Sequence, residues 1–132
     1  MDSTLGSPAA NMYRIVLLSL FLIILHSCGK PLPSLDGIDL EKWKEDKGGC
    51  QLVRQKFIDP IDQQREKIKS LSEAEVIDLL GRPDRNELLK RNQKFFYYYL
   101  EPGPACDSEK LDSKKLMIRF NAIGLAKEVS IE

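Results

Sequence analysis

The sequence predicts an α+β domain with two layers, in which N-terminal helices pack on a three-stranded or four-stranded antiparallel β-meander. Two observations lead to this fold class. Helix caps and helical spacing of apolar residues dominate residues 39–80, whereas aromatic runs and alternating patterns dominate residues 94–131. A group of helices followed by a group of strands is typical of α+β domains.

The clearest local pattern is the stretch LSEAEVIDLLGRPD, which predicts a helix over residues 73–80. Ser72 is a typical N-cap, and Glu75 follows three residues later, so the two are expected to form a capping box. Gly81 suits the left-handed backbone that ends many helices, and Pro83 prevents the helix from continuing.

The segments before this helix predict shorter helical pieces. Asp39 can cap a short helix that carries Trp43, a candidate core residue, and that stops at residues 48–49. Residues 50–58 also show helical spacing. The dipeptide Asp-Pro that opens residues 59–69 is typical of a cap and first helical residue, so one more helical segment is expected there.

The second half of the domain predicts strands. Residues 94–100, KFFYYYL, are rich in aromatic side chains, and residues 116–120 alternate between two faces. Residues 121–124 predict a hairpin turn that leads into a last strand over residues 125–131. Residues 87–90 suit a short edge strand, which would be the fourth.

The segment before the domain predicts a secretory signal that ends at a lipid-modified cysteine. The apolar run at residues 15–25 is shorter than the roughly 20 residues of a spanning helix and fits a signal peptide. LHSC, which ends at Cys28, resembles a bacterial lipobox, and this implies cleavage before the cysteine and acylation of its thiol and new amine. We expect a signal peptide over residues 1–27, with Met12 as an alternative start. The other reading is an ordinary signal peptide with Cys28 as a free thiol.

This reading gives a signal peptide, a lipid-anchored linker over residues 28–38 and a single domain over residues 39–132. Acyl chains on one cysteine provide the two signals that stable membrane anchoring needs. Gly29 rather than an aspartate after the cysteine favours release to the outer membrane in enterobacterial-type sorting. We therefore expect a location on the bacterial outer membrane, on the periplasmic face rather than the cell surface.

Cys50 and Cys106 remain after lipidation of the first cysteine, and an exported protein can form disulfides. A bond between them would contribute about 4 kcal/mol in the chain-entropy model. The alternative is two free thiols, because the sequence does not show whether the two residues are close in space.

Charge and residue content argue against several function classes. Twenty basic and twenty acidic residues give no net charge, which argues against nucleic-acid binding. The single histidine, His26, lies in the signal segment, so histidine-based catalysis is not expected in the domain. The two domain cysteines do not form a Cys-x-x-Cys pair, and no glycine-rich phosphate loop is present. We expect no catalytic residue, no metal and no cofactor.

The aromatic strand is the one segment with apolar side chains on both faces. One face must meet the helices, and the other would be exposed in a domain with two layers. Exposed tyrosine-rich patches favour contact with a partner, whereas the alternative is that loops 82–93 and 101–114 cover this face. The candidate contact residues are Phe96, Tyr97, Tyr98 and Tyr99.

Taken together, the lipobox, the capped helix, the aromatic strand and the final hairpin resemble the small outer-membrane lipoproteins of the SmpA/OmlA type, the BamE-like group. That family's helix motif is matched by Ser72, Glu75, Val76, Leu80, Gly81 and Pro83. The resemblance implies an α+β fold and a non-catalytic role in protein binding or in outer-membrane assembly and integrity. WKEDKGGCQLVRQ stands where the family has an extended Tyr/Pro-rich segment, so the resemblance supports the family's fold better than the family's partners.

Two other functions stay open at this point. An inhibitor or immunity-type module has the same combination of helices and sheet, and the sequence does not separate it from an assembly module. An envelope hydrolase that uses carboxylates is disfavoured, because Glu73, Glu75 and Asp78 are best explained as first-turn and surface carboxylates of a helix.

Overall fold

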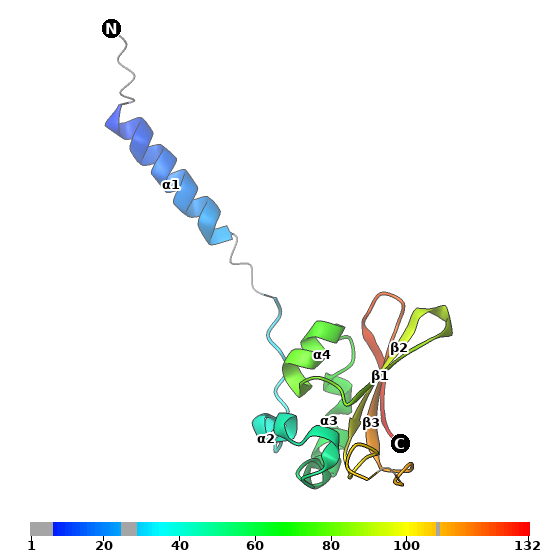
Figure 1. Cartoon of the computed structure of the whole chain (residues 1–132). Coiled ribbons are helices and arrows are strands. Elements are labelled where there is room, and N and C mark those ends of the chain that lie inside the picture. The colour runs from blue at the N-terminus through cyan, green and yellow to red at the C-terminus, as the bar shows by residue number, and fades with distance from the viewer. Residues whose placement is uncertain (1–6, 25–28, 108) are drawn as a thin grey trace. The chain divides into compact units, whose positions relative to one another are not determined.

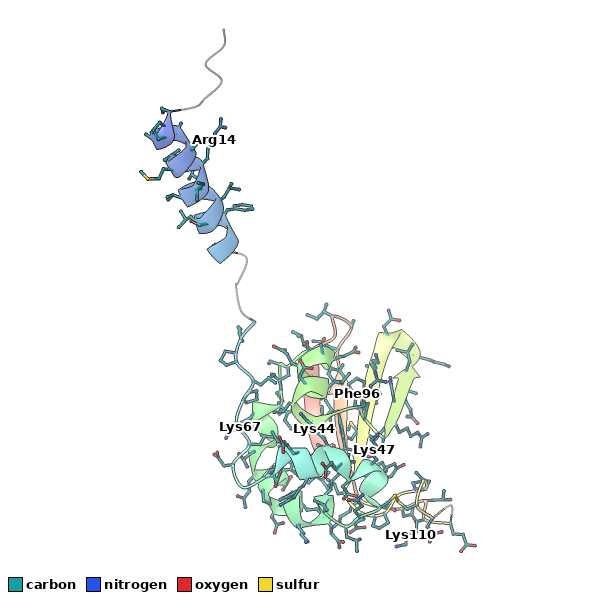
Figure 2. All side chains as sticks on the ribbon, turned by 60° about the vertical axis from the view of Figure 1, so that its left-hand side comes forward. Arg14, Lys44, Lys47, Lys67, Phe96 and Lys110 are labelled. Carbon is teal, nitrogen blue, oxygen red and sulfur yellow. A yellow bond between two sulfur atoms is a disulfide. The ribbon has the colours of Figure 1, made fainter. Side chains whose placement is uncertain are left out.

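The computed structural model describes residues 7–24, 29–107 and 109–132, and it divides into two units, Met1–Pro31 and Leu32–Glu132. In the first unit, helix α1 spans Pro8–Ile24 and carries Arg14 (Figures 1 and 2). The expected apolar run therefore lies largely within a helix, which begins before that run. Among the described residues, no helix combines the length and the apolar character needed to cross a membrane.

The second unit is an α+β domain in which helical segments lie on one face of a four-stranded antiparallel sheet (Figure 1). The predicted fold class is confirmed. The sheet order is β1-β2-β3-β4, so each strand pairs with its neighbour in sequence. The strands are β1 Arg85–Leu89, β2 Gln93–Tyr99, β3 Lys115–Phe120 and β4 Ala126–Ile131. The helices are α2 Leu40–Glu45, α3 Ile58–Gln64 and α4 Glu73–Leu80, with 3-10 turns η1 Lys47–Gly49, η2 Arg54–Phe57, η3 Arg65–Lys67 and η4 Lys90–Asn92.

The strand register determines which side chains meet the helices. Phe96 lies opposite Ile118, and Ile118 lies opposite Val129, so one row of apolar side chains crosses three strands. The rings of Phe96 and Phe120 meet edge to face at 4.7 Å. The helices contribute the other half of the core. The core cluster consists of Leu35, Ile38, Trp43, Ile61, Ile68, Val76, Leu79, Leu80, Phe96, Tyr98, Leu100, Leu116, Ile118, Phe120, Ala126 and Val129.

Helix α4 begins and ends as the sequence predicts. The hydroxyl of Ser72 accepts a hydrogen bond from the Glu75 N–H (3.2 Å), and the Glu75 carboxylate accepts one from the Ser72 N–H (2.7 Å), which completes the capping box. At the other end, the carbonyls of Leu80 and Gly81 accept bonds from the Trp43 indole (3.1 Å) and the Tyr98 hydroxyl (2.8 Å). These two aromatic side chains join α4 to α2 and to the sheet.

Residues 50–58 do not form the continuous helix that their spacing suggested. The carboxylate of the buried Asp46 accepts the backbone N–H groups of Gln51 (2.6 Å), Val53 (2.9 Å) and Arg54 (2.9 Å). These backbone N–H groups therefore bond to a side chain and not to the carbonyls of a helix. As a result, the chain forms a turn before η2.

Helix α3 also starts earlier than expected. It begins at Ile58, so Asp59 lies inside the first turn and is not its cap. Ile61 and Ile68 face inward as predicted, and both are buried.

The expected linker is partly docked on the domain. Leu35 and Ile38 belong to the core, and the Asp36 backbone exchanges two hydrogen bonds of 2.7 Å with the Gln64 side chain. The Lys67 amine donates to the Ser34 carbonyl at 3.0 Å (Figure 2). The domain thus begins at Leu32 rather than at residue 39, and only residues 29–31 separate it from Cys28.

Replacing Gly81 with valine should destabilise the domain. Gly81 has φ +82°, and a Cβ there would stand 3.0 Å from Cγ of Lys44, so a β-branched residue would be strained in its backbone and crowded by its neighbour. We expect the free energy of unfolding to fall by about 1–3 kcal/mol, as measured by chemical denaturation. Arg82→Val, at the next and exposed position, is the matched control; equal losses for both variants would contradict the assigned helix end.

Candidate partner-binding surface

One face of the sheet points away from the helices (Figure 1). Aromatic side chains of β2 lie on this face. On β2, Phe95 and Tyr97 alternate with core residues and therefore point outward. Their rings stack at 6.3 Å with an interplanar angle of 11°. Met117 lies opposite Tyr97 and is only 6% exposed, although it is not part of the helix-side core. Phe95 and Tyr97 are half-buried and reach the surface, and we call these two residues the outer aromatic patch; the buried Met117 adjoins it.

Charged side chains surround this patch in balanced pairs. The Arg85 guanidinium and the Lys115 amine lie 6.0 and 5.9 Å from the centre of the Tyr97 ring, one from each neighbouring strand. Cations at this distance are attracted by the ring face. The ion pairs on this face are Arg85–Glu87, Lys115–Glu132 (3.9 Å) and Arg119–Glu128 (2.9 Å). Each base is thus paired with an acid, and the rim carries no net charge.

The Tyr97 hydroxyl keeps its proton at neutral pH. It donates a hydrogen bond to the Glu87 carboxylate at 3.3 Å. Partial burial, together with the negative charge of Glu87, raises the pKa of Tyr97 above its usual range. The ring is therefore held by a neighbouring strand, with its apolar body on the surface and its polar end satisfied. This arrangement suits a protein contact, because the side chain has little freedom left to lose on binding.

Two of the four aromatic residues predicted to contact a partner belong instead to the core. Phe96 and Tyr98 point toward the helices and are buried, and Tyr98 donates to Gly81. Burial also raises the pKa of the Tyr98 hydroxyl far above its usual range, so it stays a hydrogen-bond donor. The sequence could not separate the two faces, because both are apolar.

Tyr99 points outward, but the loop between β2 and β3 covers it. A Cβ on Gly103 would lie 2.6 Å from Cγ of the Tyr99 ring, so the loop backbone rests directly on this side chain. Tyr99 is accordingly buried. The alternative prediction, that a loop covers this face, is therefore correct for Tyr99. Of the four candidate contact residues, only Tyr97 lies at the surface.

A disulfide holds this loop in place. Cys50 and Cys106 are bonded, with their Cα atoms 5.5 Å apart. Close by, the Gly103 N–H donates to the Gly48 carbonyl at 2.9 Å. Gly49 has φ +69°, and a Cβ there would stand 2.5 Å from the Glu101 carbonyl oxygen, so only glycine fits. The two glycines predicted to stop a helix thus also allow the loop to approach.

A basic cleft of about 460 Å³ lies on the helix side of this loop. It is lined by Lys44, Lys47, Gly48, Gly81, Arg82, Pro83, Asp84 and Ala105 (Figure 2). The Lys44 amine donates to the Asp78 carbonyl at 2.8 Å. The carboxylate of Asp84 is already occupied by the N–H groups of Gly48 (2.8 Å) and Tyr99 (2.7 Å) and by Arg54 (2.6 Å). The cleft can attract anions, but its lining offers neither a nucleophile nor a free general base.

Sequence reasoning missed the buried Arg54. Its side chain is 1% exposed, and it donates to the Asp84 carboxylate (2.6 Å), the Trp43 carbonyl (2.9 Å) and the Tyr99 carbonyl (3.3 Å). Its guanidinium also lies 5.1 Å from the centre of the Trp43 ring. No local pattern marks an arginine in a turn as buried, because its partners are 11 to 45 residues away.

The remaining predictions concern metals, cofactors and the lipid. Over the described part of the chain, no three His, Cys, Asp or Glu side chains group as a metal site would need. Cys28, the predicted lipidation site, lies outside the described residues. Comparisons with protein-family models, curated proteins and solved structures found no match. The resemblance to the BamE-like group therefore stays a prediction.

Thiol titration can test the disulfide in solution. In a Cys28→Ala chain denatured without reductant, we expect no reactive thiol, because both remaining cysteines are bonded. Reductant should lower the melting temperature, since a bond that closes a loop of this length contributes about 4 kcal/mol. The chain with Cys50→Ser and Cys106→Ser is the control and should not respond to reductant. Two titratable thiols per chain would contradict the bond.

Proposed function

We propose that this chain is a non-catalytic lipoprotein of the bacterial envelope, whose domain binds another protein through the outer aromatic patch. The observation that carries the proposal is the surface formed by the half-buried rings of Phe95 and Tyr97, which has an apolar centre and a balanced charged rim. Protein interfaces combine such a centre with a polar rim, and aromatic residues are enriched in them. A partner of matching chemistry presents an apolar surface without a strong net charge.

The proposed anchor is Cys28, at the end of the lipobox-like LHSC. Its support comes from the preceding apolar run, which lies largely in α1, and from the short distance to the folded domain. Four residue steps from Cys28 to Leu32 reach at most about 14 Å when extended. A lipid on Cys28 would therefore keep the domain close to the membrane surface.

The resemblance to BamE-like lipoproteins favours a role in assembly or integrity of the outer membrane, on the periplasmic face. An inhibitor or immunity-type module would use the same surface, and only the identity of the partner separates the two. A hydrolase is disfavoured, because the carboxylate of Asp84 in the cleft already pairs with Arg54 and accepts two backbone hydrogen bonds.

Cys28→Ala should prevent attachment of the lipid. In cells that process lipoproteins, we expect the wild type in the detergent phase of a phase separation, with incorporated radiolabelled palmitate. The variant should incorporate no palmitate and should remain an unprocessed precursor. Cys50→Ser, which removes a different cysteine, is the matched control and should keep the label. Palmitate incorporation by the Cys28→Ala chain would contradict the anchor.

A photo-crosslinking amino acid at Phe95 should trap the partner in living cells. The same probe at Leu111, which is 76% exposed and lies outside the patch, is the matched control. We expect one discrete adduct from position 95 and none from position 111. Phe95→Ala with Tyr97→Ala should weaken binding of the identified partner at least about tenfold, as expected for aromatic residues at the centre of an interface. Unchanged affinity in this double variant, shown to be folded by its melting curve, would contradict the proposed surface.

A further inference from the structure

Aliphatic side chains stand exposed at the tip of the β1–β2 hairpin. Leu88 is 71% exposed and Leu89 is 51% exposed, and Lys90 and Arg91 follow them directly. Two adjacent leucines in water at a hairpin tip do not contribute to the core. Two bases follow them, so the tip carries exposed apolar side chains next to positive charge.

The β3–β4 hairpin brings a second tip to the same end of the sheet. In an antiparallel meander, alternate hairpins lie at the same end, and Figure 1 shows both extending together. This second tip carries Ile123, which is 78% exposed, and Lys127 follows it at the start of β4. Leu88, Leu89 and Ile123 thus form one apolar end, which we call the hairpin end.

The hairpin end is basic. Residues 88–94 and 121–127 contain four bases and no acid. Lys94 pairs with Glu73 at 2.5 Å, whereas none of the other three bases has a carboxylate within ion-pair distance in the described residues. These three are Lys90, Arg91 and Lys127.

The opposite end of the sheet differs in charge. The β2–β3 loop lies there and contains four acids and two bases over residues 101–114, with Lys110 visible at that end in Figure 2. Leu111 in this loop is at least as exposed as the hairpin leucines, but Glu109, Lys110 and Asp112 surround it in the sequence, so acids outnumber bases there. One end of the domain is therefore apolar and basic, which suits a surface that is apolar and negatively charged. The opposite end is acidic and does not suit such a surface.

We infer that the hairpin end rests on a phospholipid bilayer, with Leu88, Leu89 and Ile123 entering the headgroup boundary and the nearby bases meeting lipid phosphates. Membrane-surface elements combine exposed aliphatic residues with Lys and Arg in this way, and anionic lipids attract clustered bases. The inference rests on the proposed function only in that the lipid anchor brings the domain to the membrane. The contact itself is made by residues of the domain. It would orient the domain relative to the membrane, which a flexible tether alone would not do.

Tryptophan quenching by brominated phospholipids tests this contact in the full, membrane-purified chain. Trp43 is the only tryptophan and is completely buried, so its emission should not respond. We expect Leu88→Trp and Ile123→Trp, reconstituted in vesicles of brominated phosphatidylcholine with phosphatidylglycerol, to lose about half of the added emission, because the ring enters the acyl boundary. Leu111→Trp is the matched control and should stay bright. Bright tryptophans at both hairpin positions, or equal quenching at Leu111, would overturn the inference.

A second variant pair tests the charges. Lys90→Ala with Arg91→Ala should reduce quenching of Leu88→Trp on vesicles with phosphatidylglycerol, whereas Lys110→Ala with Lys114→Ala should not. Equal quenching in the two pairs would overturn the role of the bases.

The lipid anchor and the hairpin contact can fail independently. If the protein stays with membranes in the phase separation while both hairpin tryptophans remain bright, the anchor holds and the hairpin contact fails. Crosslinking of the hairpin end to a protein under those conditions would assign it to a partner instead.

Discussion

The arrangement of the domain depends on one buried guanidinium. Arg54 joins the α2 backbone at Trp43, the segment after α4 at Asp84 and the end of β2 at Tyr99. A buried charge is tolerated only when it is paired and its hydrogen bonds are satisfied, and removing one partner typically costs about 3–5 kcal/mol. Asp84 meets this condition from the other side, since it also binds the N–H groups of Gly48 and Tyr99. Helices, turn and sheet are therefore fixed to a common point.

This common point also decides which part of the outer sheet face is open. Because Gly48 is held by Asp84, its carbonyl is placed to accept the Gly103 N–H of the β2–β3 loop. The disulfide between Cys50 and Cys106 fastens the same loop a few residues on, and the loop covers Tyr99. The cover ends there, so the outer aromatic patch remains at the surface. A buried ionic contact on the helix side thus sets one boundary of the proposed binding surface on the other side.

How much the sequence predicts depends on how local each cause is. The α4 helix is predicted to the residue, because Ser72, Glu75 and Gly81 act within one or two turns of the chain. The turn within residues 50–58 is not predicted. It depends on hydrogen bonds to the carboxylate of Asp46, and the burial of Asp46 depends on the tertiary structure. The open face of β2 could not be chosen either, since Phe95 and Phe96 are equally apolar and only packing separates them. The same limit applies to Leu35 and Ile38, which resemble linker residues until the core that receives them is known.

The two proposed surfaces are compatible with one orientation of the domain. The strands run between the hairpin end and the β2–β3 loop, whereas the outer aromatic patch lies on the flat face between these ends. A domain that stands on its hairpin end would therefore hold this face roughly along the membrane normal, open to a neighbour in the same membrane. A short tether favours such an arrangement, because it limits how far the domain can turn or lift away. Orientation by the hairpins would then raise the effective concentration of the patch for a partner that is itself membrane-bound, and a soluble partner would gain nothing from it.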